Sequence, residues 1–144
     1  MTEILQQMFD DGIKRYEAGE PARDLVPLFR QIVDQQPKNG SALTCLAWLY
    51  LLSDDAPRAL KAAKQAAKLN PADAQSYVNL ALAMLDTNQK GVREPVERAQ
   101  QIFTVDTQQA EEVHKNLTDA LDRKPGWKAV LKVQQWLYPP SDGL

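Results

Sequence analysis

Residues 40–73 read GSALTCLAWLYLLSDDAPRALKAAKQAAKLNPAD, and other parts of the chain repeat the pattern of this stretch. Its first half carries apolar residues three and four positions apart, the spacing that places side chains on one face of a helix. They are Leu43, Leu46, Ala47 and Tyr50. The second half has the same spacing in alanine, at positions 59, 63 and 66, and Pro71 closes the stretch. We therefore predict two helices joined as a hairpin.

The same residue types recur 34 positions earlier and 34 positions later. The matched pairs are Tyr16 with Tyr50, Pro37 with Pro71, Leu46 with Leu80, and Ala47 with Ala81. Farther along, Ala99 lies 40 positions after Ala59, so the third unit carries six extra residues. We place them in a loop near residues 87–93. A period of this size indicates stacked helical hairpins, each burying one face against its neighbour.

The repeats are expected at about residues 6–39, 40–73 and 74–113, within a single domain spanning 1–144. A pair of C-terminal helices at 107–138 could cap the stack, and residues 139–144 are expected to form a disordered tail. Altogether, the periodicity and the helix-capping residues predict eight helices. Their approximate bounds are 2–18, 21–36, 41–53, 56–69, 73–86, 94 onward, 107–123 and 127–138.

The repeated unit resembles a tetratricopeptide repeat (TPR). That family has a large residue, then Leu and a small residue, then Tyr in its first helix, and two Ala positions followed by Pro in its second. Residues 40–73 fill these positions, whereas the first unit departs at Gly12 and Ile13 and the third has Glu111 in place of Pro. The resemblance implies an all-α, right-handed superhelical solenoid of about three hairpins plus a C-terminal helical pair.

In TPR arrays, the first helix of each hairpin lines the concave surface, so the resemblance implies a partner-binding groove formed by the residues between the consensus positions. The candidate binding residues are Thr44, Cys45, Trp48, Leu51, Leu52, Val78, Asn79, Leu82 and Leu85. Most of these are apolar, and an exposed apolar strip of this extent is unusual unless something covers it. Three covers are open: the helix at 127–138 folding back, a helix or extended segment of a partner protein, or a second copy of this chain.

Some family members hold acidic chaperone tails with a clamp of Lys, Asn and Arg side chains on this surface. This chain keeps Asn79 but has Asp10, Cys45 and Gln75 where the other clamp residues would lie. We therefore do not expect binding of that kind.

Composition excludes several classes of protein. The chain has 17 basic and 19 acidic residues among 144, with no basic stripe interleaved with aromatic residues, which argues against a nucleic-acid partner. The apolar run at 43–52 is too short to span a membrane. No basic segment precedes an apolar one at the start, so we expect no secretory signal. A single cysteine, Cys45, excludes an internal disulfide and is typical of a cytoplasmic protein.

The sequence offers no arrangement of catalytic, cofactor-binding or metal-binding residues. His114 is the only histidine, without the spacing of a zinc motif, and no glycine-rich phosphate loop is present. We therefore predict a protein that is not an enzyme and needs no cofactor: a protein-interaction module or scaffold, acting as an adaptor or an assembly or chaperone-like factor. The alternative is a structural homo-oligomer, or a permanent subunit of a larger complex with its groove buried.

Overall fold

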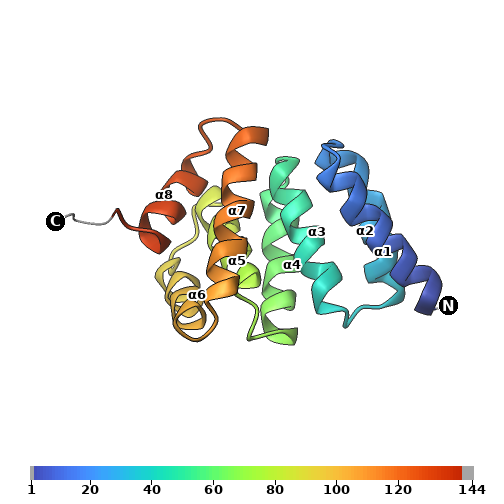
Figure 1. Cartoon of the computed structure of the whole chain (residues 1–144), viewed down its shortest axis with the longest axis horizontal. Coiled ribbons are helices and arrows are strands. Elements are labelled where there is room, and N and C mark those ends of the chain that lie inside the picture. Colours follow the sequence, from blue (N-terminus) through green and yellow to red (C-terminus); the bar gives the residue numbers. More distant parts are fainter. Residues whose placement is uncertain (1, 141–144) are drawn as a thin grey trace.

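Eight α-helices follow one another in the computed structural model, which describes residues 2–140 (Figure 1). They are α1 (Thr2–Glu17), α2 (Ala22–Gln35), α3 (Gly40–Leu52), α4 (Ala56–Leu69), α5 (Ala74–Asp86), α6 (Arg93–Val105), α7 (Thr107–Arg123) and α8 (Lys128–Leu137). The prediction of an all-α solenoid is confirmed, and the helix bounds lie within about two residues of those expected. The tail expected at 139–144 lies outside the described residues from 141 onward.

Side-chain caps fix where several of these helices begin. The carboxylates of Asp55, Asp73 and Asp106, and the side-chain oxygen of Asn39, each accept a hydrogen bond from a backbone N–H in the first turn of the following helix. These bonds satisfy donors that a helix start leaves unpaired. The starts of α3, α4, α5 and α7 are thus encoded locally.

Alanine lets α3 and α4 approach closely. Ala47 on α3 and Ala59, Ala63 and Ala66 on α4 are all completely buried. Leu43 packs into the same cluster as Ala47, Ala63 and Ala66. Small side chains allow two helix backbones to pack tightly, and this explains why the repeat needs alanine at these positions.

The third hairpin accommodates its extra residues in two places. The connection from α5 to α6 occupies residues 87–92, whereas the matching connection from α3 to α4 is residues 53–55. The remaining extra length lies in α6, because Ala99 is the seventh residue of that helix and Ala59 is the fourth residue of α4.

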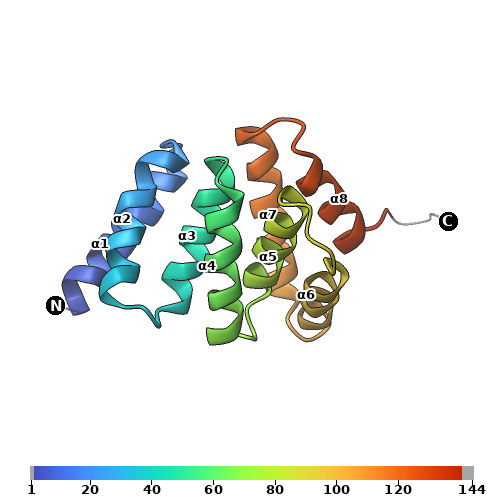
Figure 2. The ribbon, with the colours of Figure 1, turned by 180° about the vertical axis from the view of Figure 1, so that it is seen from behind.

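The hairpins stack in a row, with α1 at one end and α8 at the other (Figures 1 and 2). Figure 1 looks onto α3 and α7, and Figure 2, from behind, looks onto α2 and α4. Successive helices pack against each other, and both α7 and α8 also pack against α5. Within residues 2–140, no helix combines the length and the apolar character needed to cross a bilayer.

Candidate functional site

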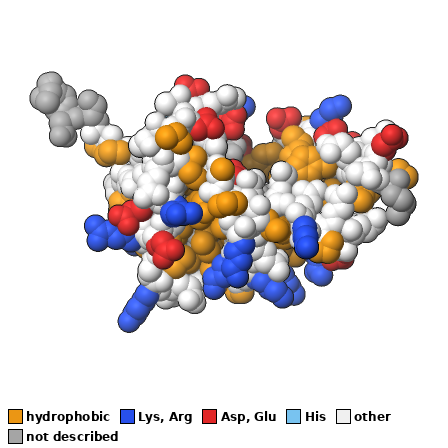
Figure 3. Space-filling view, turned by 90° about the horizontal axis from the view of Figure 1, so that it is seen from below, with side chains coloured by type: hydrophobic (Ala, Val, Ile, Leu, Met, Phe, Trp, Pro, Cys, Tyr) orange, Lys and Arg blue, Asp and Glu red, His pale blue; other side chains and the backbone are white. Residues whose placement is uncertain are grey.

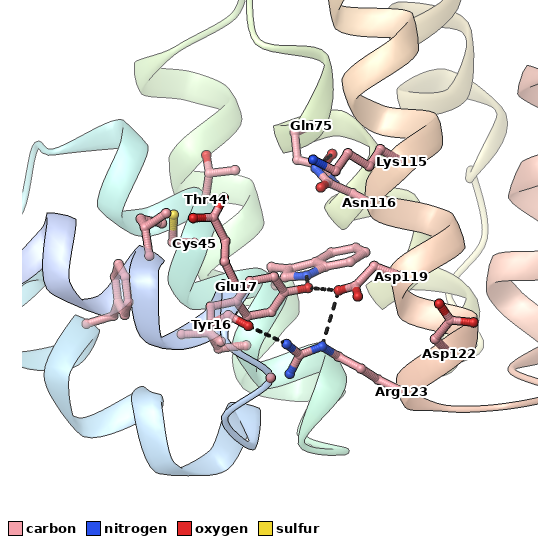
Figure 4. A pocket seen from close by; sticks show the side chains of 15 residues that line it. Tyr16, Glu17, Thr44, Cys45, Gln75, Lys115, Asn116, Asp119, Asp122 and Arg123 are labelled. Carbon is pink, nitrogen blue, oxygen red and sulfur yellow. Dashed lines mark hydrogen bonds and ion pairs between the residues drawn. The ribbon is translucent and has the colours of Figure 1, made fainter.

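A cavity of about 600 Å³ lies between α1, α3, α5 and α7, and we call it the groove (Figure 4). Its lining is apolar at the base and polar on the walls. From α1, α2 and the α1–α2 turn the lining residues are Ile13, Tyr16, Glu17, Gly19 and Phe29; from α3 and α5 they are Thr44, Cys45, Trp48, Leu49 and Gln75; and from α7 they are Lys115, Asn116, Asp119, Asp122 and Arg123. The groove therefore has α3 as its base and α1 and α7 as its walls.

Arg123 joins the two walls at one end of the groove. Its guanidinium donates from Nη2 to the carbonyl oxygen of Tyr16 at 2.6 Å and from Nη1 to that of Glu20 at 3.0 Å. It also lies 4.0 Å from the centroid of the Tyr16 ring and pairs with Asp119 at 3.2 Å. We call this set of contacts between Arg123, Asp119 and Tyr16 the brace.

The hydroxyl oxygen of Tyr16 lies at the centre of the brace. It donates to Asp119 and accepts a hydrogen bond from Nε1 of Trp48 at 2.9 Å, so α1, α3 and α7 meet at one oxygen. Burial, together with the bond to Asp119, raises the pKa of this hydroxyl well above its usual value, and the group stays protonated. The brace therefore holds the groove walls at a fixed separation.

A second cation, Lys124, reinforces the same end. Its ammonium group donates to the carbonyl oxygen of Leu51 at 3.1 Å and pairs with Asp54 at 2.7 Å. Leu51 lies in the last turn of α3, and the carbonyls bonded by Arg123 lie in and just after the last turn of α1. Cations at the C-terminal ends of helices are favourable, because they satisfy unpaired carbonyls and oppose the helix dipole.

A chain of amide side chains connects the base of the groove to α7. Asn116 donates to Gln75 at 2.9 Å, Gln75 donates to Asn79 at 2.8 Å, and Asn79 donates to the carbonyl oxygen of Thr44 at 3.0 Å. Among the described residues, every buried side-chain nitrogen and oxygen has a hydrogen-bond partner. Such a satisfied network rigidifies the packing of α3, α5 and α7.

A second cavity of about 390 Å³ adjoins the groove beyond this network. The two cavities share Gln75 and Asn116 in their linings. The second is lined mainly by polar groups, among them Asp73 and Glu112. Figure 3 shows the hollow from this end, with hydrophobic side chains inside it and acidic side chains on both sides of its rim.

The chain buries the predicted apolar strip. Of its members, Trp48, Leu51, Leu52, Val78 and Leu82 are at most 8% exposed, and Leu85 is only partly exposed. They belong to one continuous core that includes residues of α7 and α8, both of which pack against α5. The chain itself therefore buries the strip, through a core shared with other helices and not through the helix at 127–138 alone. Because the strip is buried, it gives no argument for a second copy of the chain at this surface.

Three of the nine candidate binding residues do line the groove. These are Thr44, Cys45 and Trp48, and their role in holding a partner stays a prediction. The other six are Leu51, Leu52, Val78, Asn79, Leu82 and Leu85, which line neither cavity. Asn79 is completely buried, with its amide committed to Thr44 and Gln75, so it cannot serve a ligand as it stands.

The wall formed by α7 was missed from the sequence, although the repeat contains a signal for it. The apolar residues Leu117, Ala120 and Leu121 of α7 lie 40 positions after Tyr77, Leu80 and Ala81 of α5. The same offset of 40 positions takes Gln75, Asn79 and Leu82 to Lys115, Asp119 and Asp122. All three of the latter line the groove. The offset was visible, but the groove-facing positions of α7 were not read from it.

In the described part of the chain, Cys45 and His114 lack the surroundings of catalytic residues. Burial raises the pKa of the Cys45 thiol to about 12, the opposite of what an activated nucleophile requires. His114 packs edge-on against the ring of Tyr138, 4.9 Å between centroids. No group of three or more His, Cys, Asp or Glu side chains in residues 2–140 could hold a metal ion.

The arrangement of helices, but not the sequence, has counterparts among known proteins. No family model matches the sequence, and no curated protein is significantly similar to it. Two solved structures share the arrangement of helices. One is the first TPR domain of Spaghetti (RPAP3) bound to the HSP90 peptide SRMEEVD, with 16% sequence identity and a TM-score of 0.56 over 95% of each chain. The other is the TPR domain of Sgt2 from Aspergillus fumigatus, with 18% identity and a TM-score of 0.63, covering 97% of this chain and 87% of that one.

This chain has the tetratricopeptide-repeat fold. At this level of identity the likeness concerns the fold alone. The TPR match covers nearly the whole chain, so α7 and α8 are part of the same stack as the three hairpins before them. This explains why α7 supplies a groove wall, since it takes the position of a first helix in a further hairpin.

Proposed function

We propose that this protein is a non-catalytic interaction module that holds a segment of another protein in the groove between α1, α3, α5 and α7. The observation that carries the proposal is the groove itself. A cavity of about 600 Å³ with an apolar base and polar walls has the size and character of a site for a side chain and its adjoining backbone.

The brace supports the same conclusion. Because Arg123 and Tyr16 hold α7 against α1, the walls are already in place before a partner arrives. A preformed site loses less conformational entropy on binding than one that must be assembled, and so retains more of its interaction energy as affinity. We infer that the partner adapts to the groove and that the groove changes little.

We infer that the partner is a peptide, partly by analogy with the TPR domain of Spaghetti, whose structure contains a bound peptide. An adaptor, or an assembly or chaperone-like factor, is the kind of role that such binding would serve. Groove residues Thr44, Cys45 and Trp48 are proposed to contact the partner, together with Ile13 from α1 and Asn116 from α7.

Peptide selection with the purified chain tests this proposal. A random peptide display library is panned against the immobilised protein, and the selected peptides are added while the alkylation rate of Cys45 is measured. Cys45 is the only cysteine and lines the groove, so a peptide in the groove should slow its alkylation. Selected peptides that leave the rate unchanged would place binding elsewhere and reject the proposal.

A pair of variants on α1 provides the matched control. Ile13→Trp adds bulk inside the groove and should weaken binding of the selected peptides by about tenfold or more. Ile4→Trp makes the same change on the same helix at a position that is 59% exposed and lines neither cavity. Equal affinity of the two variants would also count against the groove.

A further inference from the structure

The two adjoining cavities carry an excess of negative charge. Their linings contain five carboxylates and two cations, counted over both. The carboxylates are Glu17, Asp73, Glu112, Asp119 and Asp122, and the cations are Lys115 and Arg123. A cleft lined mainly by one sign of charge concentrates the field inside it and attracts ligands of the opposite sign.

One pair of opposite charges cancels within the lining. Arg123 bonds Asp119 and two backbone carbonyls in the brace, so neither of these two charges is directed at a ligand. Lys115 is the remaining cation of the lining, against four remaining carboxylates. Glu17 and Asp122, in contrast, form no ion pair with any residue in the described part of the chain. These two carboxylates come from opposite walls, α1 and α7; in Figure 4 the Glu17 side chain reaches toward Thr44 and Cys45, and Asp122 lies beyond Asp119 on the other side of the brace.

The base between the walls is uncharged. Helix α3 contains no charged residue, and its contribution to the lining is Thr44, Cys45, Trp48 and Leu49. Ile13 and Phe29 extend the apolar part toward α1 and α2. A ligand that satisfies both features carries an apolar side chain for the base and cationic side chains for the walls.

Resting on the function proposed above, we propose that the partner segment is an extended peptide in which lysine or arginine residues flank an apolar side chain. The apolar side chain enters the groove against Trp48 and Ile13. Flanking cations face the carboxylates of the two walls, Glu17 on α1 and Asp122 on α7, and a further cation faces Glu112 in the second cavity. An acidic segment is disfavoured, because it would bring like charges into the groove.

Synthetic peptides of matched length test the sign of the charge. The probes are fluorescein-labelled nine-residue peptides, acetylated and amidated, of leucine alternating with lysine, with glutamine or with glutamate. Affinity is measured by fluorescence anisotropy at low and at physiological salt, and the position of binding by the alkylation rate of Cys45. The lysine peptide should bind about tenfold or more tightly than the glutamate peptide, with a difference that shrinks as salt is added.

Two double variants that remove the same amount of negative charge distinguish the effect of the groove carboxylates on affinity from the effect of the overall acidity of the chain. Glu17→Gln with Asp122→Asn should weaken the lysine peptide by about three- to tenfold, since each exposed pair contributes modestly. Asp34→Asn with Glu97→Gln changes exposed carboxylates on α2 and α6, which line neither cavity, and should leave the affinity within about twofold.

Each other result overturns the inference in a defined way. Equal affinity of the three peptides, or an equal loss in both double variants, would reject the cationic partner. If library-selected peptides protect Cys45 but the lysine peptide does not, the groove binds peptides as proposed, but the preference for cationic side chains is rejected. A concentration-dependent dimer in light scattering that is lost in the Glu17 and Asp122 double variant would make a second copy of this chain the occupant instead.

Discussion

Replacing Arg123 with alanine should destabilise the protein although no core residue changes. The substitution removes two hydrogen bonds to carbonyls at the end of α1, an ion pair with Asp119 and a cation–π contact with Tyr16. The Arg123 side chain is 19% exposed, so solvent screens these interactions only in part. Hydrogen bonds to charged groups contribute about 1.5–3 kcal/mol each before such screening, and we expect a total loss of about 2–3 kcal/mol.

Urea denaturation followed by circular dichroism would measure this loss. In a thermal scan, the same change corresponds to a fall in Tm of about 5–10 °C for a chain of this size. The matched control is Arg30→Ala, which removes an exposed arginine of α2 that makes no ion pair among the described residues and should change stability by less than about 0.5 kcal/mol.

A double-mutant cycle shows whether the brace acts as a unit. Tyr16→Phe removes the hydroxyl shared by Asp119 and Trp48 but keeps the ring beneath Arg123. Groups in one network should give a non-additive result when Arg123→Ala is combined with Tyr16→Phe. If Arg123→Ala costs no more than the Arg30 control, or the two substitutions are additive, the brace does not hold the groove walls.

Two further predictions concern single positions near the groove. In Gly12→Ala, the added Cβ would lie 2.6 Å from Cε2 of the buried Phe29 ring, so overpacking of about 1–3 kcal/mol should exceed the roughly 1 kcal/mol gained in helix propensity. A higher Tm for that variant would contradict this reasoning. For Cys45, a pKa of about 12 against an ordinary value of 9.0 means about a thousandfold less thiolate at pH 8 than in the unfolded chain. Its alkylation should therefore be slow at pH 8, faster as the pH approaches 12 and fast at pH 8 in denaturant; a native rate matching the denatured one would refute it.

The sequence by itself determined the helices and their pairing into hairpins. The apolar spacing within residues 40–73, the caps at Asn39, Asp55 and Asp73, and the recurrence at 34 positions all act over short stretches of chain. Local steric and hydrogen-bonding preferences are sufficient to set such features, and the helices lie close to where they were expected.

The extent of burial could not be predicted in the same way. Helical spacing indicated that Trp48, Leu52 and Leu82 share one side of the stack, but it did not indicate what covers that side. Helices α7 and α8 share one core with these residues, and their packing on α5 depends on how far the superhelix turns from one hairpin to the next. That rotation is a sum over many contacts, none of which is marked by a local sequence signal.

The position of the site was decided by tertiary structure alone. Tyr16 and Asp119 are 103 positions apart, and nothing in the repeat pattern pairs one with the other. They meet because the stack from α1 to α6 curves far enough to bring α7 back toward α1. The groove exists only where that curvature leaves space between the two helices, so its lining can be known only once the whole stack is formed.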